Sequence, residues 1–187
     1  ATGQTRFMDG DGRTHPVYGA DVLYTIFLEL DRPLKDGDMV SFTTPFGNVL
    51  HFVRQEDCPT PFIKVNQVGY SPRATHRYAY LGGWLGTLGA WEPSETASRF
   101  AVIDAGMCRT VYTGRCRLRP DPGKTADGTP WTGENTQEID FSAVTRPGTY
   151  FIRVDGVGRS ADFTIGEAGL VTAVRTHLHG LFVQRCG

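Results

Sequence analysis

The sequence carries almost no net charge and few lysines. Its 19 Lys and Arg residues balance 20 Asp and Glu residues, for a formal charge of −1, and the only lysines are Lys35, Lys64 and Lys124. A general nucleic-acid binder gathers basic side chains on one face, where they replace the counterions of the phosphates. We therefore expect no nucleic-acid partner.

Long apolar runs are also lacking. No stretch of the chain approaches the roughly 18 apolar residues that a membrane-spanning helix needs, and no basic segment followed by an apolar one opens the sequence. We expect a soluble chain without a membrane partner, and any export signal to have been removed or to lie outside it.

Cysteine is sparse and its spacing is uninformative. The four cysteines, Cys58, Cys108, Cys116 and Cys186, form no C-x-x-C pair. A disulfide between Cys108 and Cys116 across a hairpin fits an exported protein, but spacing alone fixes no connectivity. The cysteines therefore leave the redox compartment open.

Catalytic signatures are absent as well. The sequence has no G-x-S-x-G elbow and no H-E-x-x-H motif, and Gly123-Lys124-Thr125 lacks the first glycine of a phosphate-binding loop. His177 and His179 are two residues apart and diverge around a helix, whereas metal-binding pairs stand four apart. We assign no catalytic residue and no complete metal site to this chain.

What the sequence does contain is a succession of strands. Short stretches rich in Val, Ile, Phe, Tyr and Thr are separated by turns rich in Gly, Pro, Asp and Asn, a pattern typical of all-β proteins. We predict strands at 21–30, 39–44, 48–54, 62–67, 76–83, 99–104, 109–114, 137–142, 149–155 and 159–165, with an irregular excursion at about 118–136.

Strand spacing predicts three regions. Residues 62–166 have the length of an immunoglobulin-like β-sandwich, which typically has about 100 residues. Residues 1–61 contain about three predicted strands, too few for a core of their own, and form either an N-terminal β extension or the remnant of a further β module. Residues 167–187 form a separate helical region.

One basic cluster stands out, made of Arg109, Arg115, Arg117 and Arg119. The last three alternate and so share one face of a strand. We interpret this cluster as a solvated edge strand paired with carboxylates, in preference to a site for a polyanion.

The last twenty residues change character. Large apolar residues recur at spacings of three and four after Gly166, which predicts an amphipathic helix: Leu170, Val171, Val174, Leu178, Leu181 and Phe182. A helix this short is marginal alone in water, so its apolar stripe needs a partner. Either the stripe packs back on the sandwich, or its partner is a domain that this chain lacks.

Aromatic residues offer the one candidate for ligand binding. Tyr78, Tyr80 and Trp84 share parity along the predicted strand 76–83 and its end, so they line one face, and exposed coplanar rings stack on sugars. The interpretation of these rings as core is favoured, because large aromatics on a sheet are more often buried. Trp91 and Trp131 lie in loop-like stretches and are candidates for docking against a neighbour.

Several motifs together resemble the amino-terminal immunoglobulin-like domain of family 9 glycoside hydrolases. Residues 63–72 (IKVNQVGYSP) resemble its start, and 181–187 (LFVQRCG) are similar to the first helix of the catalytic domain in those enzymes. Between them, in the family's order, come 100–104 (FAVID), 111–114 (VYTG), 132–134 (TGE), 139–142 (IDFS), 147–154 (PGTYFIRV) and 158–163 (GRSADF). The resemblance covers about residues 63–187, and 1–62 carry no motif that we can place.

The resemblance implies a cellulase-like parent whose catalytic (α/α)₆ barrel begins with the terminal helix. Such enzymes invert configuration, with an aspartate as base and a downstream glutamate as acid. The base belongs to an Asp-Ala-Gly-Asp motif that would follow residue 187. Asp104-Ala105-Gly106-Met107 echoes this motif without its second aspartate, and we assign it no catalysis.

The resemblance also bears on metals and location. Cys186 matches one of four zinc ligands in many family members, and a lone ligand does not make a tetrahedral zinc site. We expect no cofactor in this chain, while zinc and calcium remain compatible with a full-length parent. The family implies a secreted or periplasmic protein.

Together these observations favour a non-catalytic β-sandwich that packs on and stabilises the catalytic barrel of the same parent, a β-glucan hydrolase. Its docking residues would be Leu170, Val174, Leu178 and Phe182 of the helix, together with Trp91 and Trp131. The alternative is a carbohydrate-binding module in which Tyr78, Tyr80 and Trp84 stack on β-glucan. An active hydrolase is the least favoured, because no inverting pair of carboxylates can be nominated.

Overall fold

The computed structural model describes residues 6–8, 14–16, 27–44, 47–93, 98–119, 126–127, 131 and 133–185. The chain forms two compact units, residues 1–31 and 32–187. In the first unit, β1 (Arg6–Met8) pairs antiparallel with β2 (Thr14–Pro16), a short hairpin that the sequence pattern did not predict. The further division near residues 61 and 166 stays a prediction.

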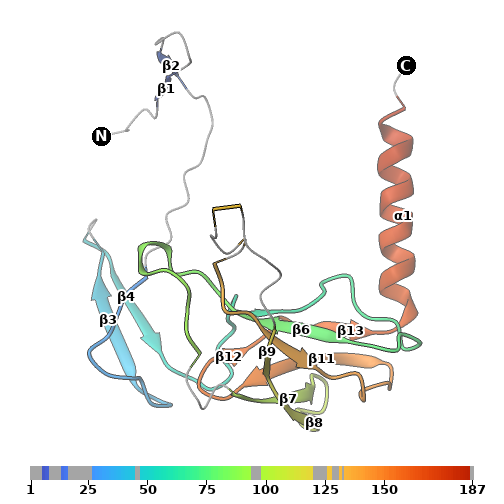
Figure 1. Ribbon diagram of the computed structural model, residues 1–187, viewed down its shortest axis with the longest axis horizontal. Helices are drawn as coiled ribbons and strands as arrows, with labels where there is room; N and C mark the ends of the chain where they lie inside the picture. Colours follow the sequence, from blue (N-terminus) through green and yellow to red (C-terminus); the bar gives the residue numbers. More distant parts are fainter. Residues whose placement is uncertain are drawn as a thin grey trace. The chain divides into compact units, whose positions relative to one another are not determined.

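The second unit is built around two antiparallel sheets (Figure 1). One sheet has the order β5 (Ile63–Lys64), β6 (Tyr78–Leu81), β10 (Gln137–Asp140), β9 (Arg117–Leu118). In the other, β11 (Gly148–Val154) pairs with β7 (Arg99–Asp104), and β7 pairs with β8 (Arg109–Arg115). The short strands β12 (Gly158–Arg159) and β13 (Phe163–Ile165) pair with opposite ends of β11.

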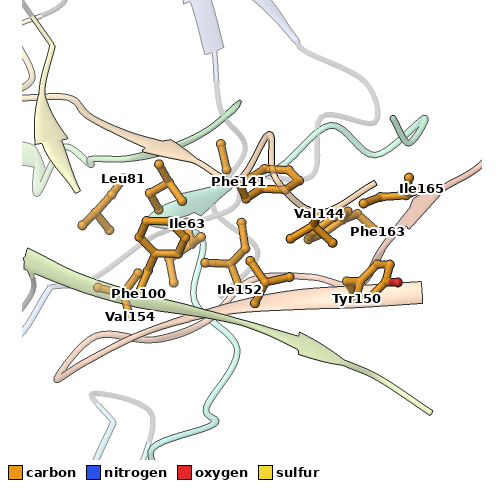
Figure 2. Close-up of a cluster of buried hydrophobic side chains, with 13 residues drawn as sticks. Ile63, Leu81, Phe100, Phe141, Val144, Tyr150, Ile152, Val154, Phe163 and Ile165 are labelled. Carbon is orange, nitrogen blue, oxygen red and sulfur yellow. The ribbon is translucent and has the colours of Figure 1, made fainter. Parts of the chain in front are cut away.

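The inner faces of the two sheets form one core. Figure 2 shows Phe100, Ile152 and Val154 of one sheet together with Ile63 and Leu81 of the other. The alternation of buried and less buried residues along β6 is what a strand with one face in a core requires, while the centre of β11 is buried on both faces. This architecture is the immunoglobulin-like β-sandwich that the sequence predicts.

Tyr150 has a position typical of this fold. It lies near the start of β11, is almost completely buried, and its hydroxyl donates a hydrogen bond to the backbone carbonyl of Arg146 at 2.9 Å. A tyrosine that bonds back to the chain a few residues upstream is a hallmark of immunoglobulin-like sandwiches. Burial raises the pKa of this hydroxyl, which therefore remains a donor at neutral pH.

A separate two-stranded sheet precedes the sandwich in the sequence. β3 (Met39–Thr43) pairs in register with β4 (Val49–Val53), as predicted for 39–44 and 48–54. One face of this hairpin carries Val40, Phe42, Leu50 and Phe52, and the last three are exposed. A 3-10 turn, η1 (Gly86–Leu88), lies between β6 and β7.

Three predicted strands differ from the structure. Of the strand predicted at 62–67, only Ile63–Lys64 forms a strand, β5. Residues 27–30 of the predicted strand 21–30 form no strand, and residues 21–26 lie outside the described residues. The predicted strand 159–165 is divided into β12 and β13, which both pair with β11. Between them, the side chain of Ser160 takes the place of a backbone partner for β11. The hydroxyl of Ser160 accepts a hydrogen bond from the N–H of Ile152 at 3.0 Å, and the Ser160 N–H donates to the Ile152 carbonyl.

The chain ends in one long helix, α1 (Glu167–Val183), where the three- and four-residue spacing predicts it (Figure 1). It follows β13 directly, with Gly166 between them. None of its residues is buried. No helix in the described part of the chain is long and apolar enough to cross a membrane.

Candidate functional site

The base of α1 is attached to the loop that follows β5. The Glu167 carboxylate accepts a hydrogen bond from the Ser71 hydroxyl at 3.2 Å and lies 3.6 Å from the guanidinium of Arg73. In the same first turn of α1, a Cβ at Gly169 would overlap the backbone carbonyl oxygen of Val68. A glycine is therefore what lets the helix approach this loop so closely.

The apolar stripe of α1 is open to solvent. Val174 is 58% exposed, Leu178 60% and Phe182 70%, while Leu170, nearest the base, is half-buried. Leu178 is nine residues from Gly169, about two and a half helical turns, so the two positions lie on opposite sides of the helix. The stripe thus faces away from the loop that α1 contacts, and the alternative in which it packs back on the sandwich is wrong.

A buried arginine holds the loop beneath the helix. Arg77 is 1% exposed, and its guanidinium donates hydrogen bonds to the backbone carbonyls of Ser71, Pro72 and Ser142 at 2.6–3.2 Å. Charged donors make strong hydrogen bonds, and several carbonyls together offset the cost of burying the charge. Arg77 therefore joins the loop at the base of α1 to the segment after β10.

The same network continues to Asp140 at the end of β10. The Asp140 carboxylate accepts hydrogen bonds from the hydroxyl and the N–H of Ser142, at 2.6 and 2.9 Å, and the Ser142 hydroxyl in turn accepts the N–H of Arg77. Partial desolvation acts to raise the pKa of Asp140, but these hydrogen bonds, with the charges of His76 and Arg117, lower it below its ordinary value.

The aromatic residues of β6 lie outside the core, which corrects the interpretation favoured from the sequence. Ala79 and Leu81 are the fully buried residues of this strand, so Tyr78 and Tyr80 project from the outer face and are half-buried. His76 stacks on Tyr78 with 5.7 Å between ring centroids, and the Arg119 guanidinium lies 5.3 Å from the Tyr80 ring. Parity along the strand was right, but the assignment of the inner face was reversed.

Charged residues stand beside these rings in register. Lys64 of β5 and Glu138 of β10 are the direct neighbours of Tyr80, and Arg117 of β9 is opposite Glu138. The outer face of this sheet, which we call the β6 face, therefore combines aromatic rings with charged hydrogen-bonding groups. Lys64 also forms an ion pair with Glu134 at 2.8 Å.

The three tryptophans have different surroundings. Trp84 is 50% exposed, with its ring against Gly133, and Trp131 is 67% exposed. Trp91 instead stacks on Phe62, with centroids 5.1 Å apart, and packs against the core. Trp84 is thus an exposed ring beyond the end of β6, whereas Trp91 packs within its own domain.

The described residues form no metal centre. No three His, Cys, Asp or Glu side chains among them are placed to hold an ion, and Cys186 lies outside the described residues. Cys58, Cys108 and Cys116 are free thiols, so the disulfide considered from the sequence is not formed. Burial raises the pKa of Cys116 to about 11.

Asp104 has a local structural role. Its carboxylate accepts hydrogen bonds from the N–H groups of Gly106 and Met107, at 3.0 and 2.9 Å, and so closes the turn between β7 and β8. Aspartate favours such turns because its side chain bonds to the backbone two residues on. The segment that echoes a catalytic motif is therefore a hairpin turn.

Comparison with known proteins agrees with this fold. The family model for the cellulase N-terminal ig-like domain matches residues 59–159, which include both sheets up to β12. The chain belongs to this family. The match begins just before β5 and leaves α1 outside it.

Two relatives extend the match. This Ig-like chain is 39% identical over 125 residues to Endoglucanase D of Acetivibrio thermocellus, covering 67% of this chain and 16% of the relative. It is 28% identical over 127 residues to a xyloglucan-specific endo-beta-1,4-glucanase of Bacteroides ovatus, covering 68% of this chain and 18% of the relative. The alignments thus span less than a fifth of either protein.

A solved structure supports the architecture. The Bacteroides ovatus GH9 structure superposes with a TM-score of 0.50 at 24% identity, over 68% of this chain and 19% of that one. At this identity the likeness speaks for the fold alone.

Sequence reasoning missed Arg77 and Gly169. Arg77 shares parity with Ala79 and Leu81, which indicates an inward side chain once the inner face of β6 is known. Gly169 interrupts an otherwise helical pattern, where a glycine costs about 1 kcal/mol relative to alanine and so often marks a close approach. Both signals were present in the sequence, but each depends on tertiary contacts for its meaning.

Proposed function

We propose that this chain is a non-catalytic accessory region of a secreted family 9 glycoside hydrolase, a β-glucan hydrolase, and that it packs on and stabilises the catalytic barrel of the same parent. The observation that carries the proposal is the exposed stripe of α1, defined by Val174, Leu178 and Phe182. Each large apolar side chain left in water forgoes about 1.5–3 kcal/mol of burial energy.

The attachment of α1 supports a docking role. The helix has 17 residues, and one of this length is marginal in water without packing. Its first turn contacts the sandwich through Glu167 and Gly169, while Leu178 faces the other way. Because the relatives are several times longer than the aligned region, the barrel of the parent is the occupant to which we assign the stripe.

Mixing the 187-residue chain with the separately produced catalytic barrel of its parent tests the proposal. Sedimentation should detect a complex, and the barrel should melt at a higher temperature when the chain is present. Leu178→Asp should abolish both effects, whereas Thr176→Asp, on the opposite side of α1, should preserve them. Neither association nor a change in barrel stability with the unaltered chain would count against a buttress.

A second candidate function is carbohydrate binding by the β6 face. It is favoured by Tyr78 and Tyr80 on the outer face of β6 and by the exposed Trp84, since exposed rings stack on sugars. The neighbouring Lys64 and Glu138 offer hydrogen bonds to hydroxyl groups. Such a module would hold the parent on β-glucan without taking part in hydrolysis.

Pull-down on insoluble cellulose separates the two candidates. Retention that is lost in Trp84→Ala and kept in Phe182→Ala, an exposed aromatic on α1, favours the module. An unaltered chain that stays in the supernatant favours the buttress alone.

A further inference from the structure

The outer face of the second sheet carries a depression lined by arginines. It has a volume of about 520 Å³, and its lining includes Arg99, Arg115, Arg153 and Asp155, with the hydroxyl-bearing Thr110 and Thr113. We call it the arginine depression. It lies on β7, β8 and β11, on the sheet that does not carry the β6 face.

Strand register explains its shape. Ala101 of β7 stands between Arg153 of β11 and Thr113 of β8, its two direct cross-strand neighbours. Two residues before Ala101 on β7, and therefore on the same face, Arg99 is directly opposite Arg115 of β8. The small side chain of Ala101 therefore forms the floor of a hollow. Its rim is formed by the longer, cationic side chains of the neighbouring arginines.

The charges in this hollow are incompletely balanced. Arg153 lies 3.8 Å from Glu56 and 3.6 Å from Asp57, but within the described ranges neither Arg99 nor Arg115 forms an ion pair. Like charges that are direct cross-strand neighbours oppose each other. An anion held between the two guanidinium groups would remove that repulsion and gain charge-assisted hydrogen bonds.

The rest of the lining restricts the kind of anion. Planar guanidinium groups match carboxylates in a two-pronged geometry. Asp155 would repel a second negative charge nearby, yet it accepts hydrogen bonds from hydroxyl groups, as the threonines also do. The complementary ligand therefore has one carboxylate with neutral hydroxyls beside it.

We propose that the arginine depression binds uronate units of an acidic polysaccharide, with the carboxylate between Arg99 and Arg115 and the ring hydroxyls toward Thr113 and Asp155. The volume falls in the range of about 300–1,000 Å³ that small-ligand sites occupy. The site would be independent of both the stripe of α1 and the β6 face.

Calorimetric titration of the 187-residue chain with oligogalacturonate tests this inference. Binding should weaken by about tenfold or more in Arg99→Gln and in Arg115→Gln, because each removes charge-assisted hydrogen bonds. Arg109→Gln, an exposed arginine at the other end of β8, should bind like the unaltered chain. Because Arg99 and Arg115 are exposed and oppose each other, neither change should lower the melting temperature.

Matched ligands make the test decisive. Methyl-esterified oligogalacturonate keeps every hydroxyl but loses the charge, and it should not bind. The inference is overturned by equal binding of the methyl ester, by unchanged affinity in both arginine variants, or by inorganic phosphate or oligoglutamate binding as tightly as the uronate. Cellulose retention and barrel association are separate measurements, so failure here leaves the proposed functions as they stand.

Discussion

The guanidinium of Arg77 donates two hydrogen bonds to the backbone carbonyl of Ser71, from Nε at 3.2 Å and from Nη2 at 3.0 Å. The hydroxyl of the same serine donates to Glu167 in the first turn of α1. The buried Arg77 thus positions Ser71, which in turn binds the first turn of the terminal helix. A rigid contact between Ser71 and Glu167 fixes the direction of α1 and therefore the position of its exposed stripe.

Arg77→Met should lower the free energy of unfolding by roughly 2–4 kcal/mol, because the partly buried carbonyls of Ser71, Pro72 and Ser142 lose their charged donor. Urea denaturation followed by tryptophan fluorescence measures the change. Arg73→Met alters an exposed arginine in the same loop and should have little effect. Equal stability of the two variants would contradict the role given to Arg77.

Two glycines of α1 should respond in opposite ways to alanine. At Gly180 a Cβ meets nothing within 4 Å, so Gly180→Ala should stabilise the helix by up to about 1 kcal/mol. At Gly169 the Cβ would overlap the Val68 carbonyl, so Gly169→Ala should loosen the helix base. Hydrogen exchange of the amides in the first half of α1 should slow or stay unchanged in the first variant and accelerate in the second.

Ser160→Ala should cost about 1–3 kcal/mol of stability. The substitution removes the acceptor for the N–H of Ile152, a residue with no exposed surface, and an unsatisfied buried donor costs about that much. Thermal and urea unfolding both report the loss. The matched change Thr176→Ala removes an exposed hydroxyl from α1 and should stay within about 0.5 kcal/mol of the unaltered chain.

Asp140 should make stability depend on pH in the acid range. Its pKa is lower in the folded chain than in the unfolded one, so its contribution is fully present above the unfolded pKa of about 3.9 and disappears as the pH falls through the folded pKa. Asp140→Asn should therefore be less stable than the unaltered chain at pH 7, and the difference should shrink as the pH falls below the unfolded pKa. A stability difference independent of pH would exclude this linkage.

Local sequence patterns predicted the positions of the sandwich strands well. They predicted less well how each strand contacts its neighbours. The strand at 99–104 coincides with β7, because alternation and turn chemistry both act within a few residues. The interruption at Ser160 was not predictable, since a serine side chain replaces a ladder bond only when the facing strand is known. The sequence likewise predicted that Tyr78 and Tyr80 share one face of their strand. Which face is buried depends on the packing of the second sheet, so it could not be predicted.

The candidate surfaces were predicted to different extents. Helical spacing predicted the apolar stripe of α1, whereas its exposure depends on the tertiary structure. The missing partner stays a prediction. The arginine depression was not predicted, because Arg99, Arg115 and Arg153 come from three strands and meet only through register. The sequence instead predicted that Arg115, Arg117 and Arg119 share one strand. Arg115 ends β8 and lines the depression, whereas Arg117 belongs to β9 of the other sheet.

The interrupted edge formed by β12 and β13 is already occupied by the chain itself. Residues 58–60 exchange backbone hydrogen bonds with Arg159, and Tyr70 does the same with Thr164 and Gly166. An open strand edge is a template for another polypeptide, whereas a broken and covered one offers no continuous row of free amides. At this border the domain resists both aggregation and strand donation, so any neighbour there must recognise it through side chains.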